Sequence, residues 1–255
     1  MGCSTSRLPG DLKLYYMPLS SPCRSVMLTA ASLGIKLNLQ PLDLMKQENL
    51  TPEFIKLNPQ HCIPTLDDEG FVLWESRAIC AYLVNMYGKD DSLYPRDPQK
   101  RAIVDARLDF DQGTLNTRLV EMFSGVFRGK LPTEEATKSF HDAMDTLEIF
   151  LTSKWVAGNE MTIADMCTVA TITTAEAIGE DISRWKNISR WLKRAKKEMF
   201  EFKEANQDGI DQFKALFKTM KDKLQQPQVP QDKPAHEEIV EEIKTHVEVE
   251  HHDKH

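Results

Sequence analysis

The sequence predicts two domains, a small α/β domain followed by an all-helical domain. Strand-like and helix-like segments alternate over residues 12–87, whereas residues 98–223 show only helical periodicity. Between them, residues 88–97 are polar and contain a proline, which is typical of a linker between domains. A chain of 255 residues is long enough for two domains of these sizes.

The first domain is predicted to begin with a strand at residues 12–17, followed by a helix that starts at Pro22. Apolar residues then recur at helical spacing until Gly34 stops the helix. The remaining elements predicted for this domain are a strand at 36–42, a short helix at 52–57, a short strand at 62–66, a turn at 67–70, a strand at 71–74 and a helix at 76–87.

The second domain is predicted to contain five helices, at residues 98–128, 133–152, 162–178, 184–197 and 208–223. Thr162 and Asp165 have the spacing of a capping box, which we assign to folding rather than to catalysis. Residues 224–255 then form a tail rich in His and Glu, with three Lys/Arg against eight Asp/Glu, a net charge of −5. The tail is predicted to be an extended proline-containing linker with a short appended helix.

Composition excludes several classes of protein. The net charge of −7 and the pI of about 5.6 exclude a nucleic-acid-binding protein that relies on bulk positive charge. No apolar run approaches the ~18–20 residues of a membrane helix, and the N-terminus lacks the apolar core of a secretory signal peptide. The five cysteines include no C-x-x-C pair, and the tail histidines have no fixed spacing. We therefore expect a reducing, cytoplasmic compartment and no metal site.

Residues 1–11 are predicted to be a flexible leader that also carries a lipidation pattern. M-G-C-S-T-S fits the N-myristoylation pattern at Gly2, and Cys3 beside it can take a palmitoyl chain. Two acyl chains anchor a protein stably to a membrane, whereas one binds marginally. The alternative is a plain leader, so membrane association depends on acylation of Gly2 or Cys3.

Three short motifs in the first domain carry chemistry. The first, S-S-P-C at residues 20–23, lies between a strand end and a helix start. A helix N-terminus has unpaired N–H groups and about half a positive charge, which favours a thiolate or another anion. Ser20 can donate a hydrogen bond to the thiolate of a ligand, or Ser20 or Ser21 can simply cap the helix. Cys23 has no partner thiol near it in sequence and is interpreted as a buried structural residue.

The second motif is N-P-Q-H-C-I-P-T-L at residues 58–66. Ile63-Pro64 is a candidate cis peptide bond, which would turn the preceding backbone groups outward to pair with an extended peptide ligand. His61 can then face an anionic end of that ligand. The alternative is an edge-strand proline and a surface histidine.

The third motif, W-E-S-R-A-I at residues 74–79, opens a helix directly after a strand. Ser76 can cap this helix, or it can offer its hydroxyl and N–H to a ligand carboxylate. Glu75 can pair with a ligand ammonium, although an acid at a helix start is favourable without any ligand.

In this order, together with L-Y-P in the linker and M-T-I-A-D at 161–165, the three motifs resemble the cytosolic glutathione transferases. The resemblance is closest to the insect delta and epsilon classes, which use a serine rather than a tyrosine, and it covers about residues 12–223. It implies a thioredoxin-like first domain that binds glutathione, a second domain that lines a pocket for an electrophilic co-substrate, and a homodimer.

The resemblance also implies a role for each motif. Ser20 would be the catalytic residue, which hydrogen-bonds the glutathione sulfur and lowers the pKa of its thiol, so that the nucleophile is the sulfur of the substrate. The other residues would bind the rest of glutathione. Ile63, before the cis Pro64, would pair with the cysteinyl backbone, and His61 would approach the glycyl carboxylate. Glu75 and Ser76 would bind the γ-glutamyl ammonium and carboxylate, where Arg77 would add positive charge.

Two positions depart from the usual family pattern. Asn49 stands where the family usually has a histidine at the glycyl end, so it can hydrogen-bond glutathione but brings no charge. Leu19 stands where the family often has a glycine beside the catalytic serine, and it can narrow the electrophile pocket. Leu119, Met122 and Phe123, in the first long helix of the second domain, are candidates for lining this pocket or are plain core.

The function implied by the resemblance is that of a detoxification-type glutathione transferase. It would join the glutathione thiolate to hydrophobic electrophiles, with glutathione as co-substrate and no other cofactor. Two alternatives stay open. Leu19 and Asn49 keep open a non-catalytic carrier of glutathione and apolar ligands. A structural or interaction protein could also use the same fold for dimerisation and the acidic tail for partners.

Overall fold

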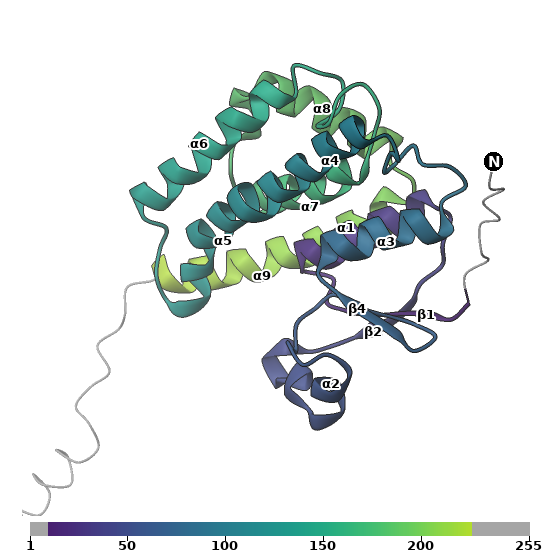
Figure 1. Ribbon diagram of the computed structural model, residues 1–255. Helices are drawn as coiled ribbons and strands as arrows, with labels where there is room; N and C mark the ends of the chain where they lie inside the picture. The colour runs from purple at the N-terminus through teal and green to yellow at the C-terminus, as the bar shows by residue number, and fades with distance from the viewer. Residues whose placement is uncertain (1–9, 226–255) are drawn as a thin grey trace, which may run out of the picture.

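The computed structural model describes residues 10–225 (Figure 1). The leader with Gly2 and Cys3, and the acidic tail beyond Gln225, lie outside the described residues. The expected architecture is confirmed within that range: a small α/β domain is followed by a helical one. No helix of residues 10–225 is long and apolar enough to cross a membrane.

The first domain is built on a four-stranded sheet with the strand order β2-β1-β3-β4. β1 pairs parallel with β2 and antiparallel with β3, and β3 pairs antiparallel with β4. Figure 1 shows α1 and α3 on one face of the sheet and α2 on the other side. The elements are β1 (Leu12–Tyr16), α1 (Ser21–Ser32), β2 (Asn38–Pro41), the 3₁₀ turns η1 (Leu44–Lys46) and η2 (Glu48–Leu50), α2 (Pro52–Leu57), β3 (Thr65–Asp68), β4 (Phe71–Trp74) and α3 (Ser76–Tyr87).

Side-chain alternation along the strands builds the core of this domain. Leu12 and Leu14 point to the same face of β1 because successive side chains of a strand point to opposite faces, and both are fully buried. Leu66, opposite Leu14 on β3, is fully buried too. These three leucines share one apolar cluster with Val26 of α1 and Leu83 of α3, so the two helices are held against the sheet.

The third strand lies further along the chain than expected. It begins at Thr65 rather than at Cys62, because Pro64 has no N–H to donate to a neighbouring strand. The turn that follows is correspondingly shorter, with Glu69 (φ 52°) and Gly70 (φ 96°) both in the left-handed region. That backbone conformation is typical of two-residue hairpin loops.

The second domain consists of helices joined by short turns. Its elements are α4 (Pro98–Phe110), the π-helical turn η3 (Asp111–Asn116), α5 (Thr117–Phe123), η4 (Ser124–Arg128), α6 (Glu134–Phe150), α7 (Ile163–Ala177), η5 (Ile182–Arg184), α8 (Lys186–Glu198), the π-helical turn η6 (Lys203–Gln207) and α9 (Asp208–Gln225).

The prediction of one uninterrupted helix over residues 98–128 is wrong, because the structure divides this range into α4, η3, α5 and η4. A π-helical turn interrupts the α-helix at Asp111–Asn116. Within it Asp111 is fully buried and paired with Arg77 of α3, and Thr117 Oγ1 donates to the Gln112 carbonyl at 2.7 Å. The wider π-helical turn places Asp111 toward the other domain. Such turns inside α-helices are frequent at functional sites.

Helix α7 is the central element of the molecule. Every residue of α7 except Glu176 is buried. Its start has the expected capping box, in which Asp165 Oδ2 accepts from the Thr162 N–H at 2.9 Å. The other carboxylate oxygen accepts from the Val156 N–H and from Trp191 Nε1, both at 2.9 Å, so the box also fastens α8 to α7.

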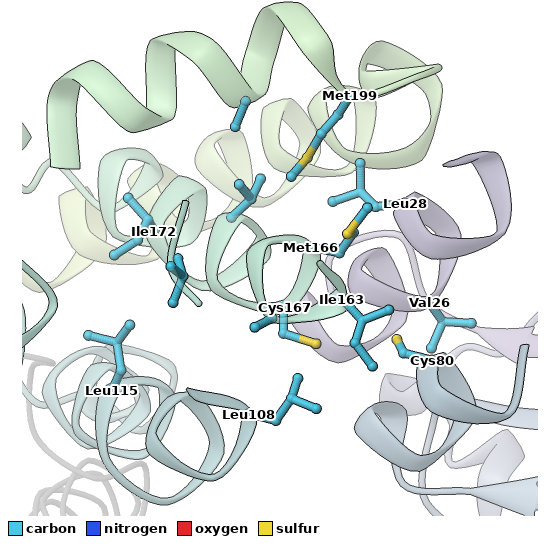
Figure 2. Close-up of a cluster of buried hydrophobic side chains, with 14 of the residues drawn as sticks. Val26, Leu28, Cys80, Leu108, Leu115, Ile163, Met166, Cys167, Ile172 and Met199 are labelled. Carbon is cyan, nitrogen blue, oxygen red and sulfur yellow. The ribbon is translucent and has the colours of Figure 1, made fainter. Parts of the chain in front are cut away.

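The two domains share one apolar core rather than two. Figure 2 shows Val26 and Leu28 of α1 and Cys80 of α3 beside Ile163 and Met166 of α7. In Figure 1, α1 and α3 accordingly lie directly against the helical domain. The position of α3, which carries the third motif, therefore depends on packing against the second domain.

Candidate active site

The three motifs converge at one end of the sheet. Tyr15 near the end of β1 is paired with Thr65 at the start of β3, which is paired with Trp74 at the end of β4. The chain therefore leaves β1 toward Ser20, enters β3 from Ile63-Pro64 and leaves β4 toward Glu75 at the same edge. Strand register brings together segments that lie up to 55 residues apart in the sequence.

Ser20 occupies the N-cap of α1. Its Oγ accepts from the Cys23 N–H at 3.4 Å, and its own N–H donates to the Met17 carbonyl at 3.0 Å. The capping bond uses a lone pair of Oγ and leaves the hydroxyl proton to be donated elsewhere. Capping and donation to a ligand, stated above as alternatives, are therefore compatible. The side chain is partly exposed, at the positive end of the helix.

The Cys23 thiol is buried directly behind Ser20. It is 0% exposed, and burial raises its pKa to about 11, against the smaller opposing effect of hydrogen bonding with the Ser20 side chain and the Met17 backbone. The thiol is therefore neutral near pH 7 and is a poor nucleophile. This matches its interpretation as a structural residue.

The second motif is organised by Asn58, which sequence reasoning missed. The expected cis peptide bond is present at Ile63-Pro64. Asn58 is fully buried, and its Nδ2 donates to the Cys62 carbonyl at 3.1 Å and to Thr65 Oγ1 at 2.8 Å. Among the described residues, the backbone of Ile63 has no hydrogen-bond partner. Its N–H and C=O groups are thus available to an extended ligand.

Asn49 and His61 come from separate loops but meet at this edge. Asn49 Nδ2 donates to the His61 carbonyl at 2.9 Å. His61 is exposed and has a left-handed backbone (φ 44°), with its N–H bonded to the Asn58 carbonyl at 2.8 Å. The Asn49 amide therefore helps to fix the loop that presents the imidazole.

At the third motif, the backbone turns sharply from β4 into α3. Glu75 has φ 71°, a conformation that is costly for a residue with a side chain and that is found preferentially at functional sites. Its exposed carboxylate accepts from Gln112 Nε2 of the second domain at 3.4 Å. Ser76, the first residue of α3, is 4% exposed, and its Oγ accepts from Arg77 Nη1 at 2.9 Å.

Arg77 does not point its charge into open solvent. Its Nη2 forms a buried ion pair with Asp111, whose other oxygen accepts from Thr171 Oγ1 at 2.8 Å. Burial opposes the positive charge, but Asp111 outweighs it and raises the pKa of Arg77 above its ordinary value. Because Asp111 compensates its charge, Arg77 acts on the site chiefly by holding the Ser76 hydroxyl. Asp111 and Thr171 carry no local sequence signal for this contact.

The candidate pocket residues fall into two groups. Leu119 and Met122 are buried in the main core. Leu19 and Phe123 pack against a second, smaller cluster built on α9, where Phe123 lies edge-on to Phe213 with ring centroids 5.5 Å apart. Phe123 also packs against the main core. We call Phe123, Phe127, Phe213 and Phe217 the aromatic cluster.

Sequence reasoning missed the α9 members of this cluster. The signal was present, because Ile210, Phe213, Phe217 and Met220 recur at helical spacing along the last helix. The periodicity does not show which surface these residues pack against. In the structure that surface comes from α5 and η4 and from Leu19 beside Ser20.

Comparison with known proteins agrees with this geometry. The family model "Glutathione S-transferase, N-terminal domain" matches residues 10–85, and "Glutathione S-transferase, C-terminal domain" matches residues 128–197. Glutathione S-transferase D7 of Anopheles gambiae is 44% identical over 210 residues, which span 81% of this chain and 96% of the relative.

Solved structures of insect enzymes superpose on most of the chain. A delta-class glutathione transferase of Nilaparvata lugens is 50% identical with a TM-score of 0.81, and the match covers 82% of this chain and 99% of that one. Bombyx mori BmGSTD1 is 46% identical with a TM-score of 0.80, again over 82% and 99% of the two chains. The chain therefore belongs to the glutathione S-transferase family, among the insect delta and epsilon classes.

Proposed function

We propose that this protein is a glutathione transferase that joins the thiolate of glutathione to hydrophobic electrophiles, with Ser20 as the catalytic residue. One observation supports it above the others: the Ser20 oxygen is engaged as a helix cap while its proton is left to be donated at the positive end of α1. Family membership supports the same activity, because the named relatives are glutathione transferases.

Stabilisation of a thiolate is the chemistry this arrangement suits. A free thiol with a pKa near 8.5 is only a few per cent ionised at neutral pH. Lowering the pKa by about two units corresponds to about 2.7 kcal/mol and makes the thiolate the major form. A hydroxyl donor and the N-terminus of α1 both favour the anion, and neither has to reorganise when the thiol ionises.

The remaining motif residues are proposed to hold the tripeptide. The unpaired Ile63 backbone, before Pro64, would pair with the cysteinyl unit as an added strand does. Glu75 would bind the γ-glutamyl ammonium, and the Ser76 hydroxyl, held by Arg77, would bind its carboxylate. The glycyl carboxylate would lie near the loop of His61 and Asn49, where the contact with the His61 backbone already occupies the Asn49 amide.

The electrophile would lie over Ser20, between Leu19 and the aromatic cluster. The glutathione sulfur would attack the electrophilic carbon, a carbon–sulfur bond would form, and the leaving group would depart with the bonding electrons. Phe123 is the predicted pocket residue that contacts both apolar clusters. Leu119 and Met122 would affect the pocket only through the packing of α5.

Glutathione is then a consumed co-substrate and not a prosthetic group. We further propose that the protein is a homodimer in the cytoplasm, as the family resemblance implies. Acylation of Gly2 or Cys3 would add membrane association and is best tested by mass spectrometry of the protein from its native cell.

The test compares Ser20→Ala with Ser21→Ala, a matched control one residue away. Turnover of 1-chloro-2,4-dinitrobenzene with glutathione should fall about 100-fold in Ser20→Ala, and the spectroscopic pKa of bound glutathione should return toward 8.5. Ser21→Ala loses its bond to Asn116 and should keep both properties. Wild-type turnover in Ser20→Ala would overturn the role of the hydroxyl. Glutathione binding without turnover in the wild type would favour the carrier.

A further inference from the structure

Two cysteines that the proposed mechanism does not use meet at the boundary between the domains. Cys80 lies on α3 of the first domain and Cys167 on α7 of the second, and both are free thiols. Figure 2 shows the two sulfur atoms pointing toward each other between these helices. The side chains are 0% and 1% exposed, so the two neighbouring thiols are closed off from solvent.

The surroundings make the two thiols unequal. Burial opposes ionisation of Cys80, but the side chains of Cys167 and Thr29 and the charge of Arg77 outweigh it and lower the pKa of Cys80. Contact with Cys80, together with burial, raises the pKa of Cys167 well above its ordinary value. Cys80 is therefore the better nucleophile, and Cys167 keeps its proton.

The pair also lies next to the candidate active site. Arg77 precedes Cys80 by one turn of α3, and Thr171 follows Cys167 by one turn of α7. These two flanking residues both bind Asp111. The thiols thus lie one helical turn from the ion pair that positions Ser76.

We propose that Cys80 and Cys167 are an oxidation site at which a hydroperoxide converts the facing thiols into a disulfide that joins the two domains. In the first step, the Cys80 sulfur attacks the terminal peroxide oxygen, the O–O bond breaks, and an alcohol or water leaves, giving a sulfenic acid. In the second step, the Cys167 sulfur attacks the Cys80 sulfur, the S–O bond breaks, and water leaves. The thiols lose two electrons and the peroxide gains them.

The burial of the two thiols makes this oxidation slow, and their positions decide which helices the disulfide joins. Because both thiols are buried, a small peroxide reaches them only when the contact between α3 and α7 opens transiently, so oxidation is slow. Once formed, the disulfide fixes the start of α3 against α7. Cys62 is partly exposed and is therefore more accessible to a peroxide than either of the two buried thiols.

The experiment uses the full-length reduced protein with hydrogen peroxide and no glutathione, so that the readout does not depend on transferase activity. After oxidation, the protein is unfolded, free thiols are alkylated, and peptides are mapped by mass spectrometry. We expect a peptide pair linked through Cys80 and Cys167, about 2 Da lighter than the two thiol peptides together and separated by dithiothreitol. The matched control Cys62→Ala should form the same link.

Single variants test the order of the two steps. Cys167→Ala should accumulate a sulfenic acid on Cys80, trapped by dimedone, whereas Cys80→Ala should leave Cys167 as a free thiol. Recovery of both buried cysteines as free thiols from wild-type protein whose Cys62 is oxidised would overturn the proposal, as would a link from either one to another cysteine. If a variant fails to fold, the wild-type peptide map decides alone. Failure here would leave the proposed transferase function unaffected.

Discussion

Arg24 Nη1 donates to Asn206 Oδ1 at 2.5 Å and so ties α1 of the first domain to the turn that precedes α9. The same guanidinium donates to Thr173 Oγ1 at 3.1 Å, to Thr174 Oγ1 at 2.6 Å and to the Ala170 carbonyl at 3.2 Å. Arg24 is 1% exposed, and no carboxylate within residues 10–225 pairs with it. Burial lowers its pKa to about 9, so neutral oxygens must stabilise the charge.

Arg24→Lys is expected to lower the free energy of unfolding by about 2–3 kcal/mol. Lysine keeps the charge but has no planar fork, so several buried oxygens lose their donor. Urea denaturation monitored by tryptophan fluorescence measures the change. The control is Arg190→Lys, an exposed arginine of α8 whose guanidinium donates to the side chain of Asn187. Equal stability of the two variants would contradict the interdomain role of Arg24.

Gly209→Ala is expected to displace either the start of α9 or the segment before Ser20. A Cβ at Gly209 would lie 2.2 Å from the Pro18 carbonyl oxygen and 3.0 Å from Arg24 Cδ, and the backbone atom cannot move aside cheaply. We expect kcat/KM to fall about tenfold or more, because small misplacements of catalytic groups are costly. A Cβ at Gly113 would have no neighbouring atom of residues 10–225 within 4 Å, so Gly113→Ala should keep wild-type kcat/KM. Similar kinetics for both variants would refute this prediction.

Asp111→Asn removes the partner of a buried guanidinium. We expect unfolding free energy to fall by about 3–5 kcal/mol, and KM for glutathione to rise because Arg77 is freed to leave Ser76. Steady-state kinetics at varied glutathione and thermal denaturation measure the two effects. Asp109→Asn, an exposed site two residues earlier, serves as the control and should change neither. A wild-type KM for glutathione in Asp111→Asn would show that Ser76 is held without Arg77.

Asp165 makes part of the stability depend on pH. Burial raises its pKa to about 6, despite the N–H donors that lower it. Between the unfolded pKa of about 3.9 and pH 6, the folded state therefore binds the proton more tightly than the unfolded state does. The stabilisation is complete below about pH 4 and is lost as the pH rises through 6.

Asp165→Asn, which does not titrate, isolates this contribution. The stability advantage of the wild type over the variant should be about 2 kcal/mol larger at pH 4.5 than at pH 7. Urea unfolding of both proteins at the two pH values measures it. An advantage that grows with pH would mean that the hydrogen bonds to the carboxylate outweigh its burial.

Phe213→Ala should alter the electrophile pocket more than the glutathione site. Phe213 packs against Phe123, Phe127 and Phe217, so truncation leaves a gap in the aromatic cluster next to Leu19. We expect KM for a hydrophobic electrophile to change about threefold to tenfold, with KM for glutathione nearly constant. Leu216→Ala, on the exposed side of α9, is the control. Parallel changes in both KM values would argue that the cluster supports folding instead.

The sequence alone predicted the order of most elements and the places of the three motifs within them. The first helix ends before Gly34, and α2 begins at Pro52, directly after its N-cap. Thr162 and Asp165 form the expected capping box. These features depend on hydrogen bonds and backbone angles within a few residues, which residue type fixes directly. The same local signals predicted that Ser20 lies at the start of a helix and that Ile63-Pro64 is a candidate cis bond, and the structure has both features.

Only the tertiary structure decided which of these residues meet. The pairing of Arg77 with Asp111, the contact of Asn49 with the His61 loop, the facing thiols of Cys80 and Cys167 and the cover of α9 over Leu19 join residues distant in sequence. Each depends on how whole elements pack, and on the π-helical turn that redirects Asp111. Residue spacing along one chain carries no such information, because side-chain contacts between elements are set by the geometry of the shared core.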